Sequence, residues 1–212
     1  MALLEKHAFH GDNHLIGLFD ELLPRSSSFV ETGSAEGRTV AYVAQRFPDM
    51  RVFSCEIHPP SLAKARARCA QLRNVEISST RSPEFLHELL TKTPAIKSEV
   101  TTYWLDAHWD GYWPLLNELR FLFAHVDRAF IAIDDFKVPS RSEFGFDCYG
   151  GQECSLDYIA PVLRTREHSI ILPKYGMDSK VLNQLRGTCT IIVGQKGLSF
   201  SPELMNSFEI LN

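Results

Sequence analysis

Residues 28–39 have the sequence SFVETGSAEGRT, and this stretch decides the fold class. Ser28–Thr32 has the residue types of a short strand, and the apolar pattern of a helix follows at residues 37–47. Gly33 and Gly37 lie between them, where glycine lets the backbone approach a ligand closely and leaves helix N–H groups facing it. The stretch therefore predicts the first strand, ligand-binding turn and helix of an α/β sheet.

The alternation of strand and helix patterns continues along the chain. Further strands are predicted at residues 51–56, 75–79, 101–106, 129–134, 168–173 and 189–195, and helices at residues 59–72, 83–90, 112–124 and 153–163. Such alternation is typical of a mostly parallel sheet with helices on both faces. Residues 174–187 carry no strong helix pattern, which favours an antiparallel last strand. We expect a Rossmann-like α/β fold with a seven-stranded sheet.

Composition indicates a soluble globular chain. Of its 212 residues, 44% are hydrophobic and 23% are charged, which fits one domain over residues 1–212. Within it we expect an N-terminal helical cap at residues 1–27 and a mobile loop over the site at residues 137–155. The apolar stretches are far shorter than the roughly 20 residues of a membrane helix. A net charge of −4 without a basic stripe argues against nucleic-acid binding.

The cysteines and the first residues bear on location. Five cysteines without a Cys-x-x-Cys pair suit reduced thiols and disfavour a zinc ribbon or a disulfide scaffold. The first residues lack the pattern of a secretory signal. We therefore expect a cytoplasmic protein that acts on a small molecule and binds neither membrane nor nucleic acid; homo-oligomerisation stays open.

Carboxylates follow the first two predicted strands, and ligands of open α/β sheets bind at such strand ends. Glu31 suits a ligand with a cationic amino group and would repel a pyrophosphate, whose Gly-x-Gly-x-x-Gly spacing is also missing. Glu56, 19 residues beyond Gly37, has the position typical of a carboxylate that binds both hydroxyls of an adenosine ribose. The alternatives are a purely structural turn and a solvated carboxylate. Ser82, after the third strand, is placed to cap a helix or to contact an adenine.

A cluster of acidic residues follows the fourth and fifth strands. Asp106, His108 and Asp110 follow one strand, and Asp134 and Asp135 follow the other. Carboxylates so close repel one another unless a proton or cation neutralises them. Their oxygens suit Mg²⁺, Mn²⁺ or Ca²⁺, and an imidazole also admits Fe²⁺ or Zn²⁺. The cluster predicts a metal site at Asp106, Asp134 and Asp135, with helix capping or a metal-free acidic pocket as alternatives.

Three roles stay open for His108: a general base near neutral pH, a metal ligand, or a group that supports a ligand. The neighbouring aromatic residues Trp109, Tyr112 and Trp113 form either the wall of a substrate pocket or ordinary packing.

His7, His10 and His14 recur at near-helical spacing. We interpret them as exposed residues of an N-terminal helix rather than as a metal-binding face.

Together, residues 31–39, Glu56, the Asp106 block and the Asp134–Asp135 pair resemble the class I S-adenosylmethionine-dependent methyltransferases. Residues 186–193 are similar to the start of that fold's antiparallel seventh strand. Within the class, the chain resembles the small metal-dependent O-methyltransferases, such as the macrocin O-methyltransferase group and, more distantly, catechol O-methyltransferase. The resemblance implies metal ligation by Asp106, Asp134 and Asp135, and a base at His108 or Asp110.

The resemblance implies methyl transfer from S-adenosylmethionine to an oxygen of a small acceptor. It also implies cofactor contacts from residues of four strand ends, namely Glu31, Gly33, Ser34, Gly37, Thr39, Glu56, Ser82 and Asp106. Mg²⁺ is the metal expected first, with Mn²⁺ or Fe²⁺ as alternatives. Three rival functions remain: a metal-dependent hydrolase, an NAD-type oxidoreductase and a non-catalytic S-adenosylmethionine-binding protein.

Overall fold

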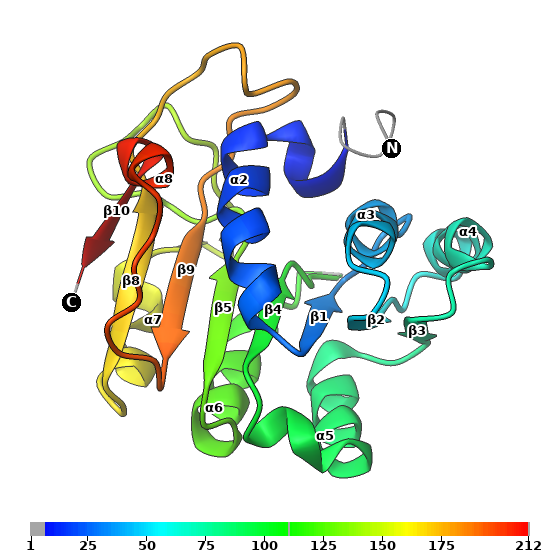
Figure 1. Ribbon diagram of the computed structural model, residues 1–212. Helices are drawn as coiled ribbons and strands as arrows, with labels where there is room; N and C mark the ends of the chain where they lie inside the picture. Colours follow the sequence, from blue (N-terminus) through cyan, green and yellow to red (C-terminus); the bar gives the residue numbers. More distant parts are fainter. Residues whose placement is uncertain (1–6, 110, 212) are drawn as a thin grey trace.

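The computed structural model describes residues 7–109 and 111–211 and contains an eight-stranded central sheet (Figure 1). The strand order is β10-β8-β9-β5-β4-β1-β2-β3. The strands are β1 (Ser28–Thr32), β2 (Arg51–Cys55), β3 (Val75–Ser78), β4 (Thr101–Leu105), β5 (Ala129–Ile133), β8 (His168–Pro173), β9 (Cys189–Val193) and β10 (Phe208–Leu211). Strands β1 to β5 pair in parallel, β9 is antiparallel to both β5 and β8, and β10 is antiparallel to β8.

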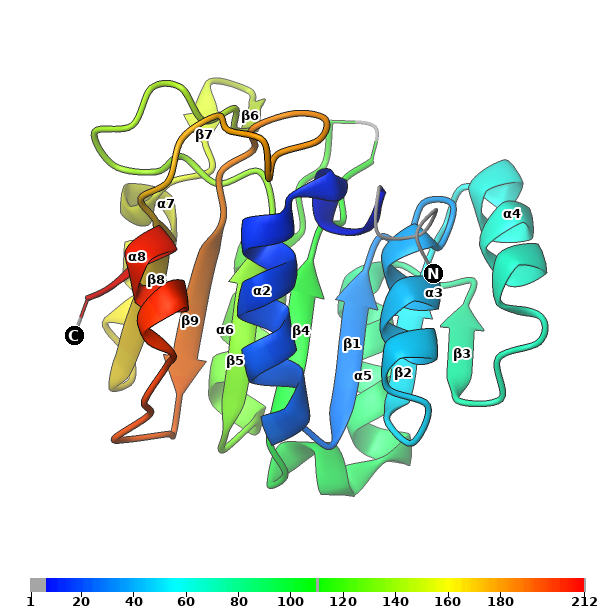
Figure 2. The ribbon, with the colours of Figure 1, turned by 45° about the horizontal axis from the view of Figure 1, so that its top comes forward.

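Helices cover both faces of the sheet (Figure 2). One face carries α2 (Asn13–Leu22), α3 (Arg38–Arg46), α4 (Pro59–Cys69) and α8 (Pro202–Ser207), and the other carries α5 (Ser82–Lys92), α6 (Leu115–His125) and α7 (Leu156–Leu163). Successive strand residues point to opposite faces, so Phe29 and Val30 of β1 enter two different hydrophobic cores. Because both faces are covered, all five residues of β1 are buried.

The predicted Rossmann-like α/β fold is confirmed, and each of the seven predicted strands forms. The sheet has an eighth strand, β10, that the sequence analysis missed. β10 has four residues, pairs only with β8, and exposes Glu209, so it lacks the long apolar alternation of the other strands. The strand at residues 189–193 is antiparallel as expected, and it lies between β5 and β8.

Three segments far apart in the sequence gather above the carboxyl ends of β1, β4 and β5 (Figure 2). They are residues 7–12, which include the 3₁₀ turn η1 (Ala8–Gly11), residues 136–155, and residues 174–187. The second segment contains the small hairpin of β6 (Cys148–Tyr149) and β7 (Gln152–Glu153). Backbone hydrogen bonds join them: Leu182 N–H donates to the carbonyl oxygen of Gly11, and Gly145 N–H donates to that of Leu185. We call these three segments the cover. The predicted single domain and the mobility of residues 137–155 stay predictions.

No helix in the described part of the chain is long and apolar enough to cross a membrane. All five cysteines are free, and Cys148 alone among them is exposed.

Candidate functional site

The turn after β1 lies against the end of β4. Gly33 has a φ of +81°, and a Cβ atom there would lie 2.7 Å from the carbonyl oxygen of Asp106 and 2.9 Å from Cα of Ala107. Gly37 has a φ of +70° at the start of α3, and its Cβ would lie 3.0 Å from Cα of Ala65. At both positions, backbone atoms occupy space that a side chain would need.

The N–H groups of this turn are used inside the protein. Those of Gly33 and Ser34 donate to the carbonyl of Cys55, and that of Gly37 donates to the carbonyl of Ser34 at 2.6 Å. The Ala35 N–H donates to Oε2 of Glu56 at 2.8 Å. These four residues precede α3, so the expectation that the N–H groups of the helix itself face a ligand stays a prediction. Because the N–H groups of this turn already have partners inside the protein, they are not free to bind a pyrophosphate. The missing Gly-x-Gly-x-x-Gly spacing leads to the same conclusion.

Glu56 lies at the rim of a cavity of about 240 Å³. Its Oε1 accepts the N–H of His58 at 2.8 Å, so both carboxylate oxygens have backbone partners that fix the side chain. The lining of this cavity combines the ends of β1, β2, β3 and β4 and includes Gly33, Ala35, Glu56, Ser82, Asp106 and His108. The arrangement agrees with the expectation that carboxyl ends of strands share one binding site.

A second cavity of about 250 Å³ adjoins the first, since Gly33, Ala35 and Asp106 line both. It is also lined by Glu31, Ser34, Thr39 and His10. Glu31 is 3% exposed, and its Oε2 has no hydrogen-bond partner among the described residues. Burial, together with the charges of Asp134 and Glu56, raises the pKa of Glu31 well above its usual range. A buried carboxylate without a partner is costly, so a cationic ligand group would stabilise it here.

Ser82 does not cap a helix. It is the first residue of α5, while Arg81 holds the cap position and makes no side-chain cap hydrogen bond. The capping alternative is therefore wrong, and Ser82 is a buried residue of the 240 Å³ cavity.

The acidic residues gather as predicted. β4 and β5 pair in register up to Leu105 and Ile133, so Asp106, Asp134 and Asp135 leave neighbouring strands side by side. Burial and the charges of Asp134, Asp135 and Glu31 raise the pKa of Asp106 well above its usual range. Burial and Asp134 raise the pKa of Asp135 to about 6, although Arg186 opposes the shift. Burial is the largest cause of both pKa shifts, and repulsion between the neighbouring carboxylates adds to it.

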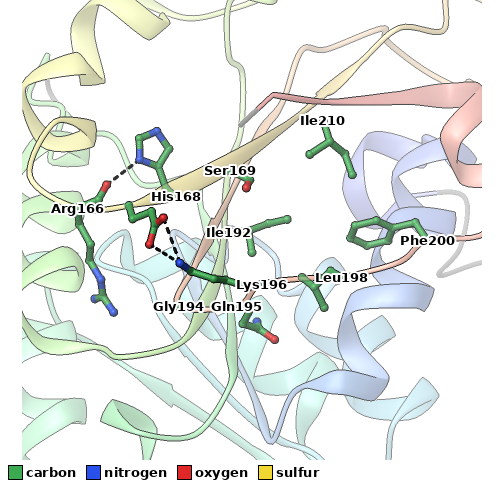
Figure 3. A pocket seen from close by; sticks show the side chains of 12 residues that line it. Arg166, His168, Ser169, Ile192, Gly194, Gln195, Lys196, Leu198, Phe200 and Ile210 are labelled. Atoms are coloured by element: carbon green, nitrogen blue, oxygen red, sulfur yellow. Dashed lines mark hydrogen bonds and ion pairs between the residues drawn. The ribbon is translucent and has the colours of Figure 1, made fainter.

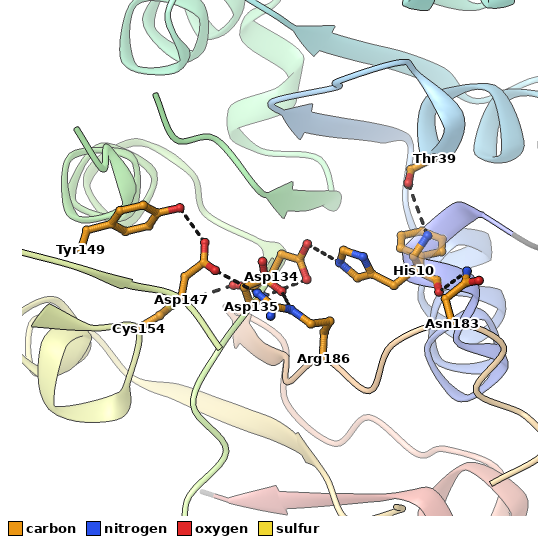
Figure 4. Close-up of polar contacts among 10 residues, drawn as sticks. His10, Thr39, Asp134, Asp135, Asp147, Tyr149, Cys154, Asn183 and Arg186 are labelled. Atoms are coloured by element: carbon orange, nitrogen blue, oxygen red, sulfur yellow. Dashed lines mark hydrogen bonds and ion pairs between the residues drawn. The ribbon is translucent and has the colours of Figure 1, made fainter. Parts of the chain in front are cut away.

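Two cations from the cover contact this cluster, and sequence analysis missed both (Figure 4). His10 Nε2 lies 2.6 Å from Oδ2 of Asp134, and the negative charge of Asp134 raises the pKa of His10 to about 9. Arg186 donates from Nε to Asp135 and from Nη2 to Asp147 at 2.9 Å. Asp147 also accepts the hydroxyl of Tyr149 at 2.7 Å. His10 and Arg186 lie far in sequence from the carboxylates that they contact, so no local pattern relates them.

The interpretation of three exposed N-terminal histidines is wrong for two of them. His7 is exposed, but His14 is buried, with its ring nitrogens 2.9 Å from Oγ of Ser207 and 3.0 Å from Oδ2 of Asp178. Phe9 and His10 have φ values of +47° and +59°, which end the helical geometry before α2 begins. The resulting turn directs His10 toward the end of β5.

His108 lies at the mouth of the site and is exposed. Its ring centre is 5.5 Å from that of Tyr149, and Tyr149 lies equally far from Trp113. Trp113 stacks on Tyr158 at 4.4 Å, whereas Tyr112 is 43% exposed. Trp113 thus packs against another aromatic ring, and the wall of a substrate pocket stays a prediction.

Trp109 lines the 240 Å³ cavity. Asp110, the other candidate base, lies outside the described residues.

A larger cavity of about 770 Å³ lies at the opposite end of the sheet, between β8, β9 and β10 (Figure 3). Its charged groups are already paired: Lys196 lies 2.9 Å from Glu167, and Arg166 donates to backbone carbonyls of residues 126 and 127. Ile192, Phe200 and other apolar residues form much of the rest. None of the predicted site residues lines this cavity, so its size does not make it the candidate site.

No protein-family model matches the sequence, and no curated protein does so. Solved structures do match the fold. The O-methyltransferase TomG from Streptomyces achromogenes, solved with S-adenosylmethionine, has a TM-score of 0.61 and 16% identity, with 86% of this chain and 79% of that chain covered. An O-methyltransferase from Bacillus cereus, solved with S-adenosylhomocysteine, has a TM-score of 0.60, 12% identity and coverage of 85% and 80%.

An rRNA methylase from Streptococcus thermophilus matches with a TM-score of 0.54 and 16% identity, over 87% of this chain and 97% of that chain. These identities are low, so the likeness concerns the fold and leaves the acceptor open. The chain has the fold of the class I S-adenosylmethionine-dependent methyltransferases, as its strand-end motifs predict.

Proposed function

We propose that this protein transfers a methyl group from S-adenosylmethionine to an oxygen of a small-molecule acceptor. One observation carries the proposal: two adjoining cavities at the ends of β1, β2 and β4, with Glu31 in one and Glu56 in the other. The cofactor has an ammonium group at one end and a ribose diol toward the other, and the two carboxylates match that order. The solved O-methyltransferases with bound cofactor support the choice of ligand.

In this proposal each cofactor contact uses a feature of the site. Glu31 would bind the ammonium group, because its buried Oε2 lacks a partner among the described residues. Gly33 would let the ends of β1 and β4 lie close together beside the cofactor, because the backbone of Asp106 and Ala107 occupies the space of a side chain. Glu56 would accept the ribose hydroxyls, and Ser82 would lie beside the adenine. Ser34, Gly37 and Thr39 would shape the methionine side of the pocket, which Ser34 and Thr39 line.

The acidic cluster fits a divalent metal ion. Asp106, Asp134 and Asp135 offer carboxylate oxygens from neighbouring strand ends, and a dication would offset the repulsion between these carboxylates. These three residues would hold the ion. When bound, it would act as a Lewis acid that lowers the pKa of the acceptor hydroxyl.

The acceptor would lie between the cluster and the aromatic residues at the mouth. Trp113 and Tyr149 would contact its apolar surface, with their rings 5.5 Å apart. His108 stands beside Tyr149 and is open to solvent, so one of its ring nitrogens would remove the hydroxyl proton and release it to water. The cover, which lies over this space, would hold the acceptor in line with the sulfonium.

Calorimetric titration with S-adenosylhomocysteine tests the proposal through Glu56. Two hydrogen bonds between a carboxylate and the ribose hydroxyls contribute roughly 1.5–3 kcal/mol each. We expect Glu56→Ala to weaken binding at least tenfold. Glu76→Ala, which removes an exposed carboxylate of β3, is the matched control and should bind as the parent does.

Unchanged affinity in Glu56→Ala would remove Glu56 from the cofactor site. Binding of NADH in place of S-adenosylhomocysteine would favour the oxidoreductase instead.

A further inference from the structure

We propose that His10 is a ligand of the metal ion at the acidic cluster, and that the site therefore prefers Mn²⁺ over Mg²⁺. The inference deepens the proposed function by naming a ligand and a metal for the same site. It is tested by metal binding alone, without cofactor or acceptor.

The ligand atoms are already close together. One nitrogen of His10 and one carboxylate oxygen each from Asp134 and Asp135 all lie within 4.8 Å of one another. Asp134 has a side chain only 1% exposed, while that of His10 is 32% exposed and faces the 250 Å³ cavity. Asp106, on the neighbouring strand end, lines the same cavity as His10 and would face the ion from the cofactor side.

The fold holds His10 in this position from two directions. The Phe9 ring is buried, stacks on Phe19 at 4.1 Å and meets Trp104 edge-on at 5.1 Å. On the other side, Nδ2 of Asn183 donates to the carbonyl oxygen of His10 at 2.8 Å. A ligand held by packing and hydrogen bonds needs little reorganisation to bind an ion.

A separate observation indicates that the cavity receives positive charge. Glu31, 3% exposed and with Oε2 unpartnered among the described residues, lines the same cavity as His10 and Asp106. Arg186 pairs with Asp135 and Asp147 at this cluster (Figure 4). The space between His10 and Glu31 would then accommodate both the ion, at the His10 end, and the ammonium group of the cofactor, at the Glu31 end.

The donor set decides the metal. Carboxylates suit Mg²⁺, Ca²⁺ and Mn²⁺, whereas imidazole suits later transition metals and adds little for Mg²⁺. Mn²⁺ accepts both donor types. If Asp106, Asp134 and Asp135 alone held the ion, all of its protein ligands would be oxygen atoms. A nitrogen ligand would therefore distinguish a site that includes His10 from a site of carboxylates only.

The experiment titrates the full chain with Mn²⁺ alone and with Mg²⁺ alone, followed by calorimetry. The parent should bind Mn²⁺ more tightly than Mg²⁺. His10→Ala should weaken Mn²⁺ binding at least tenfold and change Mg²⁺ binding much less. His7→Ala removes another imidazole that lines the same cavity and should bind both ions as the parent does.

Pulsed electron paramagnetic resonance of the Mn²⁺-loaded protein gives a direct second readout. Coupling to a nitrogen nucleus should appear in the parent and in His7→Ala and be absent in His10→Gln. The glutamine variant keeps a side chain that can contact Asp134, so it serves if the alanine variant fails to fold.

Equal Mn²⁺ affinity in the parent and the His10 variants, or a parent spectrum without nitrogen coupling, would overturn the inference. So would a parent that binds S-adenosylhomocysteine but no Mn²⁺. A parent that binds Mn²⁺ through His10 but no S-adenosylhomocysteine would support the inference and overturn the proposed function.

Discussion

The two halves of the candidate site are built differently. On the cofactor side, Gly33, Glu56 and the turn between them come from one β-α-β unit, and backbone hydrogen bonds fix them. On the acidic side, Asp134 meets His10 from 124 residues away, and Asp135 meets Arg186 from 51 residues away. The first half follows from local sequence, while the second exists only when the cover is folded over the strand ends.

The largest expected effect is on the cofactor side. Gly33→Val should abolish S-adenosylhomocysteine binding, because a side chain there meets the backbone of Asp106 and Ala107 and must also adopt a φ of +81°. Calorimetry measures the loss, and circular dichroism checks the fold.

Gly197→Ala is the matched control for backbone strain. Gly197 has a φ of +68°, but nothing lies within 4 Å of its Cβ position. We expect this variant to bind normally. A Gly33→Val protein that bound as well as the control would place the cofactor elsewhere.

On the acidic side, removal of the positive charge of Arg186 from the cover should lower the stability of the protein. Arg186→Ala leaves Asp135 and Asp147 without their shared cation, and its side chain is only 23% exposed. Removing one partner of such a buried network costs about 3–5 kcal/mol of unfolding free energy. Urea denaturation measures the change.

Arg46→Ala is the control for that experiment, since its pair with Asp20 is largely exposed and should contribute at most about 1 kcal/mol. Equal losses in the two variants would mean that Arg186 does not hold the acidic side together.

A smaller effect is expected from Glu118 of α6, which is 1% exposed beneath the cluster. Burial raises the pKa of Glu118 from the ordinary value of 4.5 to about 7, although the neighbouring hydroxyls of Ser82 and Thr32 lower it. The folded state therefore binds the proton more tightly than the unfolded state, and stability falls as pH rises from 4.5 to 7.

Glu118→Gln should remove this loss of stability at high pH, because the glutamine side chain does not ionise. A shift of this size corresponds to about 3 kcal/mol, so we expect the variant to be more stable than the parent by about that amount at pH 8 and by much less at pH 4. Urea denaturation at both pH values checks it. A difference independent of pH would show that the Glu118 carboxyl does not titrate as inferred.

The contrast between the two halves also explains what sequence analysis achieved. β1, its glycine turn and Glu56 were predictable because a strand, a turn and a helix each have a short-range pattern. The grouping of Asp106 with Asp134 and Asp135 was predictable from parallel strand order. The four-residue edge strand β10 lacks such a pattern. His10 reaches Asp134 through positive φ values that helical spacing does not indicate.

A crystal structure of the protein grown with S-adenosylhomocysteine tests the central claim most directly. We predict ligand density across the two adjoining cavities at the carboxyl ends of β1, β2 and β4, with the amino group at Glu31 and the ribose at Glu56. Density in the 770 Å³ cavity at the opposite end of the sheet, or none under saturating ligand, would contradict the account.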